Sequence, residues 1–269
     1  MQQIGNHTNI KIEENLLRHM ILNSIRSYNA KFKDKYGQMI IACDGYKYWR
    51  KELFPYYKAN RKKDREASEI DWNAVFEVLN KVRDELKEFF PYRVIHLEGA
   101  EADDIIGALC QEFGNSMEDI LIISGDKDFR QLQSYRNVKQ YDPVKKAMVT
   151  ENDPERYLKE HIIRGDGGDG VPNFLSADNC LVLKIRQKSI TQKKLDVWLK
   201  QDPEEFCDEA MLRGYKRNEA LIDLTLIPEH IKEQILSSYH EQEGKNKSKL
   251  FNYFIKMGLK NLMTDIDQF

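Results

Sequence analysis

The chain has 269 residues, a formal net charge of −2 at pH 7, 41% apolar residues and 32% charged residues. This composition is typical of a soluble globular protein and allows one large domain, or one domain with a smaller lobe. The cysteines form no CxxC pair, which argues against a disulfide framework or a zinc knuckle. MQQIGNHTNI is not a signal peptide and no apolar stretch could span a membrane, so we expect a cytoplasmic protein with reduced thiols.

The near-neutral net charge hides a segregation of charge along the chain. Lys and Arg dominate residues 47–65, 181–195 and 245–260, whereas acidic residues gather after predicted strands. Basic lobes around an acidic centre are typical of a protein that holds a polyanion at its rim and metal ions at its centre.

The predicted elements begin with a helix over Ile10–Phe32, whose apolar stripe should pack on a sheet. A strand follows at Gln38–Cys43 and ends in Asp44. The next stretch, Tyr46–Arg65, interleaves aromatic and basic residues. Aromatic rings stack on bases while Lys and Arg neutralise phosphates, so we interpret this stretch as a nucleic-acid contact. A solvated helix with a partly buried aromatic face is the alternative.

A long amphipathic helix is predicted over Ile70–Phe90, because Pro91 ends a pattern of helical period. A strand then runs from Arg93 to near Glu98, and a helix with an acidic first turn covers Glu101–Phe113. Acids in a first helical turn suit the helix macrodipole without any metal, but this explanation covers only one or two of them.

The strongest local signal is a short buried strand at Ile120–Ile123. Isoleucine fits a pleated surface, and the apolar run is too short for a helix. Asp126 and Asp128 follow directly, ahead of a helix predicted around Phe129 and Leu132.

The remainder of the chain is predicted to be mostly helical. A strand pair at Val138–Gln140 and Ala147–Thr150 flanks a turn, and helices follow from Asp153, with a glycine-rich break over Gly165–Gly170. We therefore expect an α/β fold with a mainly parallel central sheet flanked by helices over residues 1–150. A helical part is expected over residues 151–269.

Acidic residues follow three of the predicted strands, and two more lie in the glycine-rich break. Ligands of open parallel sheets sit beyond the carboxyl ends of the strands, so the acids at the strand ends are expected to converge. Their repulsion must be relieved by protons, by Lys or Arg, or by bound cations. All-oxygen ligation suits Mg²⁺, with Mn²⁺ as a substitute. The candidate ligands are Asp44, Glu101, Asp103, Asp104, Asp126, Asp128, Asp166 and Asp169.

Four motifs together resemble the flap endonuclease (5′ nuclease) family: Asp44-Gly45 with YKANR, then GAEADDIIG, IISGDKDFRQL and RGDGGDGVP. Further segments, including YWRKELFPYYKANR and YFIKMGLKNL, resemble the ribonucleases H of T-even bacteriophages within that family. The resemblance implies a PIN-like, metal-dependent nuclease that removes 5′ flaps and RNA primers in phage DNA replication, in the host cytoplasm. Its implied partners are branched DNA, 5′ flaps, RNA–DNA hybrids and a phage single-stranded-DNA-binding protein, and a monomer is expected.

The resemblance also implies two metal clusters, and how the acids divide between the two metals stays open. Asp44, Glu101, Asp103, Asp104 and Asp126 fall on positions of the first cluster, and Asp128, Asp166 and Asp169 on those of the second. Lys58 and Arg61 fall on the family's basic pair at the base of a helical arch, predicted here over residues 58–70. The implied catalytic residues are Lys58, Arg61, Asp44 and Asp126.

The GDGGDGVP segment falls on the family's helix-turn-helix element, which holds duplex backbone. Its usual glycine-rich continuation is replaced by NFLSADNCLVLKIRQKS. A K⁺-assisted phosphate contact is therefore a weaker expectation, and basic residues of this segment are expected to substitute. The predicted DNA-binding residues are Arg50, Lys51, Lys58, Arg61, Lys62, Lys63, Lys184, Arg186 and Lys188.

The amino terminus departs from the family, which opens with a strand ending in a metal-binding Asp. This chain has no Asp before Asp34, so either the sequence begins late or the protein lacks that strand. A junction-DNA-binding protein with weak or no catalysis is therefore an alternative hypothesis. A phosphatase with an aspartyl nucleophile is a third, and the basic aromatic stretch disfavours it. The six histidines are scattered, and each is interpreted as a surface or packing residue.

Overall fold

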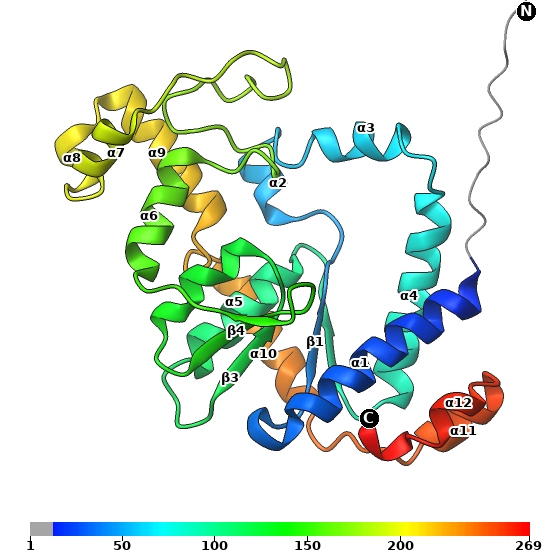
Figure 1. Ribbon diagram of the computed structural model, residues 1–269. Helices are drawn as coiled ribbons and strands as arrows, with labels where there is room; N and C mark the ends of the chain where they lie inside the picture. Colours follow the sequence, from blue (N-terminus) through cyan, green and yellow to red (C-terminus); the bar gives the residue numbers. More distant parts are fainter. Residues whose placement is uncertain (1–12) are drawn as a thin grey trace, which may run out of the picture. The chain divides into compact units, whose positions relative to one another are not determined.

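The computed structural model describes residues 13–269, which fold into two compact units (Figure 1). Each unit is assembled from separate stretches of the chain. Residues 13–43, 61–95 and 239–269 belong to the first unit, and residues 44–60 and 96–238 to the second. The predicted boundary near residue 150 lies inside the second unit and remains a prediction.

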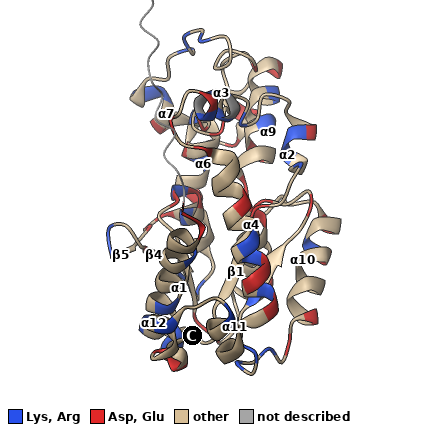
Figure 2. Ribbon diagram, turned by 90° about the vertical axis from the view of Figure 1, so that its right-hand side faces the viewer, with Lys and Arg blue, Asp and Glu red and all other residues tan. Residues whose placement is uncertain are grey.

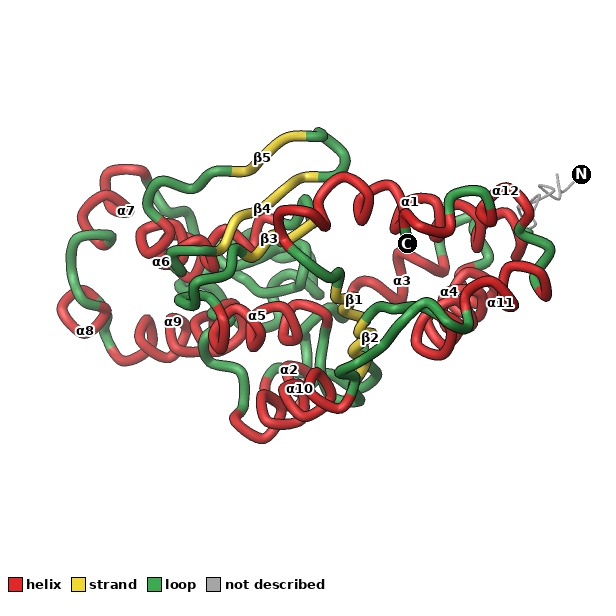
Figure 3. Tube along the Cα trace, turned by 90° about the horizontal axis from the view of Figure 1, so that it is seen from below, coloured by secondary structure: helices red, strands yellow, loops and turns green. Residues whose placement is uncertain are grey.

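The first unit is built around two long helices, as the sequence predicts. Residues 10–12 of the first predicted helix lie outside the described part of the chain. Leu22, Val82 and Phe254 come from three different helices and meet in one buried core. Its elements are α1 (Glu14–Tyr36), β1 (Ile40–Cys43), α3 (Asn60–Glu66), α4 (Trp72–Phe89), β2 (Arg93–His96), α11 (Leu250–Lys256), α12 (Lys260–Met263) and η2 (Ile266–Gln268). The two strands pair with each other (Figure 3).

The second unit contains a three-stranded sheet, in which β3 (Ile120–Ile123) lies beside β4 (Val138–Asp142) and β4 beside β5 (Ala147–Val149) (Figure 3). The β3–β4 pair is parallel and the β4–β5 pair antiparallel. Within residues 13–269 the strands form two small sheets, and the β3–β4 pair is parallel, as expected for the predicted α/β fold.

Two helical segments cover this sheet and carry its acidic edge. They are α5 (Ala102–Phe113) and η1 (Lys127–Ser134). Phe129 of η1 packs in one buried cluster with Ile122 of β3 and Val138 of β4. The helix predicted around Phe129 is thus a 3₁₀ helix, whose tighter turns directly follow the strand that ends at Ile123.

The rest of the second unit is helical, in agreement with the prediction from Asp153 onward. Ile162 and Tyr215, on two of these helices, share a second buried core. The helices are α2 (Trp49–Leu53), α6 (Pro154–Arg164), α7 (Gln192–Trp198), α8 (Pro203–Phe206), α9 (Glu209–Ile222) and α10 (Glu229–Glu241). The predicted helix-turn-helix element corresponds to α6, the following turns and α7, and it remains a prediction. Within the described residues no helix has the length and apolarity needed to cross a membrane.

Candidate metal centre

Asp126 and Asp128 follow the carboxyl end of β3, where the sequence places them. Asp126 caps η1, because its side chain accepts a hydrogen bond from the Asp128 backbone N–H at 3.0 Å. The chain passes close to the neighbouring strand here, since a Cβ at Gly125 would lie 3.2 Å from the Asp142 carboxylate. Glycine before the two acids therefore lets the strand end turn sharply towards η1.

The start of α5 gathers a second group of acids. Glu101 is the N-cap residue, and Asp104 accepts a hydrogen bond from the Glu101 backbone N–H at 2.9 Å in a reciprocal capping box. Asp44 Oδ1 accepts from the Ala102 backbone N–H at 2.9 Å. The N-terminus of α5 thus attracts Asp44 through both a hydrogen bond and the helix macrodipole.

Asp166 and Asp169 lie in the turn that follows α6. Gly165 has φ +70°, and a Cβ there would lie 2.4 Å from the Pro172 carbonyl oxygen, so this position requires glycine. Asp166 Oδ1 then accepts from the Gly168 backbone N–H at 2.9 Å. Gly165 is thus needed by the geometry of this turn, and the Gly168 backbone N–H fixes the first of the two acids.

Four of the predicted ligands line one pocket of the second unit: Asp103, Asp128, Asp166 and Asp169. They come from α5, η1 and the turn after α6, so the tertiary fold brings together acids that are far apart in the sequence. Such a concentration of carboxylates is what a divalent cation with oxygen ligands requires.

Burial and mutual repulsion make two of these acids hard to ionise. Burial raises the pKa of Asp103 to about 7; nearby Lys58 opposes the rise, and the charges of Asp126 and Glu101 add to it. Burial likewise raises the pKa of Asp128 to about 6, against the opposing effect of His161. A cation in the pocket would favour the ionised forms, so this set of residues fits a bound metal.

Lys58 supplies positive charge directly beside the acids. Its ammonium lies 2.5 Å from Glu101 Oε1 and 3.4 Å from Asp169 Oδ2. Its backbone has φ +52° and donates a hydrogen bond to the Asp169 carbonyl at 2.7 Å. The Tyr57 hydroxyl lies within hydrogen-bond distance of both Glu101 and Asp169, at 2.9 and 3.0 Å. Lys58 therefore lies directly beside the acid cluster, and its predicted contact with the scissile phosphate remains a prediction.

The burial of Arg50 contradicts its predicted contact with DNA. Its side chain is 2% exposed, and its guanidinium lies 2.7 Å from Asp104 and 3.1 Å from Glu101. A buried guanidinium that neutralises two carboxylates cannot also reach DNA. The same geometry argues against Asp104 as a metal ligand, because its other oxygen accepts from Trp49 Nε1 and from the Glu101 backbone. Both residues hold the start of α5 in place.

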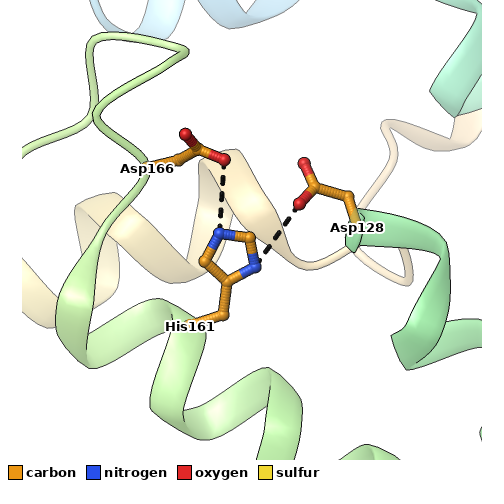
Figure 4. Close-up of side chains that lie close together, drawn as sticks. All are labelled: Asp128, His161 and Asp166. Atoms are coloured by element: carbon orange, nitrogen blue, oxygen red, sulfur yellow. Dashed lines mark hydrogen bonds and ion pairs between the residues drawn. The ribbon is translucent and has the colours of Figure 1, made fainter. Parts of the chain in front are cut away.

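His161 is the functional candidate that the sequence interpretation missed. Its ring is buried between Asp128 and Asp166 (Figure 4). Lys127 Nζ lies 2.7 Å from Asp166 as well. Burial alone would raise the pKa of Asp166, but hydrogen bonds from His161 and Lys127 outweigh it and hold this pKa below its usual range. The available signal was spacing, since His161 lies one helical turn before the loop that carries Asp166.

The remaining predicted DNA contacts lie apart from this cluster in the sequence. Lys51 is exposed on α2. Arg61 and Lys63 are exposed on α3, a helix rich in basic residues (Figure 2), whereas the side chain of Lys62 lies outside the described part of the structure. The turns between α6 and α7 carry a further exposed basic group, consisting of Lys184, Arg186 and Lys188.

Two family models and several known proteins match the chain over most of its length. Residues 5–162 match the family model described as the 5′-3′ exonuclease, N-terminal resolvase-like domain, and residues 146–269 match that of T4 RNase H, C terminal. The chain is similar to ribonuclease H of Enterobacteria phage T4, with 35% identity over 96% of this chain and 88% of that protein. A 5′-3′ exonuclease of Buchnera aphidicola is 25% identical over 87% of this chain and 85% of its own length.

Solved structures show the same fold. The D15 protein of T5, crystallised with metal ions, matches 86% of this chain and 96% of its own with a TM-score of 0.59 and 18% identity. A T5 D15 flap endonuclease variant in a pseudo-enzyme-product complex with DNA and metal ions matches 88% of this chain and 93% of its own, with a TM-score of 0.56 and 18% identity.

Proposed function

Because the chain belongs to the 5′-3′ exonuclease family, we propose that it is a divalent-metal-dependent nuclease acting on 5′ flaps and on the RNA of RNA–DNA hybrids. The observation that carries the proposal is the pocket shared by Asp103, Asp128, Asp166 and Asp169 beside the ammonium of Lys58. Removal of RNA primers and flaps during phage DNA replication is the role that this activity would serve.

Asp103, Asp128 and Asp169 of the pocket would hold the metal, with Asp44 and Asp126 at its edge. Asp166 would support them from behind, because hydrogen bonds already engage both of its oxygens. When bound, divalent ions polarise the phosphate and lower the pKa of an attacking water. We propose Mg²⁺ at two sites, with Mn²⁺ as a substitute. Lys58 would donate to the phosphoryl oxygens as charge develops on them, because its ammonium already adjoins two of the acids. Arg61 is proposed to assist it from the arch.

The exposed basic residues would position the substrate by phosphate contacts. Lys51, Lys63 and the group formed by Lys184, Arg186 and Lys188 are proposed to contact duplex and flap backbone, the last group in place of a K⁺-assisted contact. We also propose that the protein is a monomer and that a single-stranded-DNA-binding protein is one of its partners.

A junction-binding protein without catalysis is the weaker candidate. Binding alone does not require buried carboxyls whose pKa values burial and repulsion raise, as in Asp103 and Asp128. Such groups are costly unless a function uses them.

Cleavage of a 5′-labelled flap substrate in Mg²⁺ tests the proposal. The wild-type protein should release short 5′ products, and Asp103→Asn should release them at least about a hundredfold more slowly at unchanged duplex affinity. Glu118→Gln, which changes an exposed acid of the same unit, is the matched control and should cleave normally. Flap binding without Mg²⁺-dependent cleavage would favour the junction-binding protein instead.

A further inference from the structure

The ring of His161 joins two elements of the metal centre (Figure 4). Its Nε2 lies 3.3 Å from Asp166 Oδ2, in the turn after α6, and its Nδ1 lies 3.5 Å from Asp128 Oδ1 on η1. The residue is only 7% exposed. The two ends of the ring nevertheless have different surroundings.

The Nε2 end is held by hydrogen bonds. Asp166 Oδ2 is within hydrogen-bond distance of both His161 Nε2 and Lys127 Nζ. The other oxygen of Asp166 accepts from the Gly168 and Asp169 backbone N–H groups at 2.9 and 3.3 Å. Both oxygens of this carboxylate are therefore already engaged, and the carboxylate fixes the plane of the ring.

The Nδ1 end is different, because its buried polar atoms face each other without forming a hydrogen bond. Within the described residues, neither His161 Nδ1 nor Asp128 Oδ1 has a hydrogen-bond partner. Their separation of 3.5 Å is longer than an ordinary N–H···O hydrogen bond. Buried polar atoms are rarely left without a partner, so the pair indicates a ligand between them.

We propose that His161 Nδ1 and Asp128 Oδ1 are two ligands of one divalent cation of the nuclease site, and that Asp166 orients the imidazole from behind. Two adjacent ligand atoms about 2.1 Å from an octahedrally coordinated cation lie about 3.0 Å apart. A closer approach of about half an ångström would therefore place His161 Nδ1 and Asp128 Oδ1, 3.5 Å apart here, on one cation. A metal-bound histidine commonly donates its other ring N–H to a carboxylate, which is the arrangement of Nε2 and Asp166. The lone pair of Nδ1 then faces Asp128.

A nitrogen ligand changes which metal the site selects. Mg²⁺ favours oxygen ligands, whereas imidazole is a common ligand of transition metals. The cation beside His161 is therefore expected to be bound more selectively as Mn²⁺ than carboxylates alone would allow. This inference rests on the proposed nuclease function for the location of the site, but metal binding is measured without DNA.

Pulsed electron paramagnetic resonance of the full chain with one equivalent of Mn²⁺ tests the proposal. The wild-type spectrum should show coupling of Mn²⁺ to an imidazole ¹⁴N. His161→Gln should abolish this coupling and weaken Mn²⁺ binding by at least about tenfold, with a smaller loss for Mg²⁺. His230→Gln changes an exposed histidine in the same unit and should preserve both coupling and affinity.

Two further variants separate ligation from folding. His161→Asn places an amide oxygen near the position of Nδ1, so it should retain part of the Mn²⁺ affinity while losing the imidazole coupling. Asp166→Asn should weaken binding but keep the coupling, because it alters only the group behind the ring. Thermal melts of the metal-free variants show whether each remains folded.

Absence of ¹⁴N coupling in the wild-type protein would overturn the proposal, and so would coupling that survives in folded His161→Asn. Either result would leave His161 as a hydrogen-bonding bridge between two aspartates. Coupling without any flap cleavage would contradict the proposed nuclease function and leave the metal ligand intact. The two proposals can therefore fail separately.

Discussion

Arg50 and Asp104 form an ion pair sheltered from solvent, with 2.7 Å between Nη1 and Oδ1 and side chains 2% and 0% exposed. The guanidinium also lies 3.1 Å from Glu101, and its Nε donates to the Leu221 carbonyl at 2.9 Å. Burial disfavours the charged form, but the neighbouring Asp104, Tyr57 and Glu101 hold the pKa of Arg50 above its usual value. One cation thus ties α2 to α5 and to the end of α9.

Replacing Arg50 should therefore destabilise the protein severely. Arg50→Ala leaves two buried carboxylates without their counter-charge and is expected to lower the free energy of unfolding by about 3–5 kcal/mol. Lys51→Ala removes the neighbouring exposed charge and should change it by less than about 0.5 kcal/mol. Urea unfolding of both variants measures the difference. A stability loss below about 1 kcal/mol in Arg50→Ala would contradict the structural role of the ion pair.

Lys58 is expected to act on the reacting phosphate more than on binding. Its ammonium adjoins Glu101 and Asp169, so its charge is placed where the phosphate meets the acids. Lys58→Ala should slow single-turnover cleavage by about 10²–10³-fold while duplex affinity changes little. Lys200→Ala, at an exposed site on the same unit, is the control for loss of one positive charge. An equal loss of affinity and rate would reassign Lys58 to substrate anchoring.

The acidic edge could be predicted from the sequence because strand-end geometry is local. Ile120–Ile123 forms β3, as predicted, and Asp128, five residues beyond Ile123, lines the pocket with Asp103. The burial of Arg50 could not be predicted, because its carboxylate partner Glu101 lies 51 residues away in the sequence. A basic residue in a basic stretch is indistinguishable from a DNA contact until its burial is known.

The same limit applies to His161, whose neighbour Asp128 lies on a different element. Periodicity places a histidine on a helix face, but it does not say what that face packs against. The pairing of the strands in two small sheets could not be read from the sequence, since strand pairing depends on long-range contacts and not on the pattern within each strand.

The exposed basic group between α6 and α7 should contribute to the salt dependence of DNA binding. Each phosphate contact adds about 0.9 to the magnitude of the slope of log affinity against log salt. A variant with Lys184, Arg186 and Lys188 all changed to Gln should therefore lose about 2.7 units of slope if all three contact phosphates. Titrations of flap DNA in Ca²⁺ at several salt concentrations measure the slope. A second variant with Lys232, Lys216 and Lys139 changed to Gln controls for the loss of three positive charges. An unchanged slope in the variant of residues 184, 186 and 188 would exclude phosphate contacts by these residues.

Metal binding should depend on pH because Asp103 and Asp128 hold protons in the metal-free protein. Their pKa values are raised from 3.8 to about 7 and about 6. Folded-state values above the unfolded ones favour the folded chain below about pH 4, and this contribution is lost as the pH rises through 6 and 7. The metal-free protein should thus become less stable between about pH 4 and pH 7 through these groups, while metal affinity rises as they lose their protons.

Calorimetric titration of Mg²⁺ in buffers with different heats of ionisation counts the protons released. About one to one and a half protons should leave per site filled at pH 6, and almost none at pH 8, if both carboxyls ionise on binding. Asp103→Asn should remove most of the release at pH 6, because the higher of the two pKa values belongs to that residue. Glu118→Gln changes an acid outside the pocket and should leave the count unaltered. Proton release that is the same at both pH values would show that neither carboxyl is protonated before the metal binds.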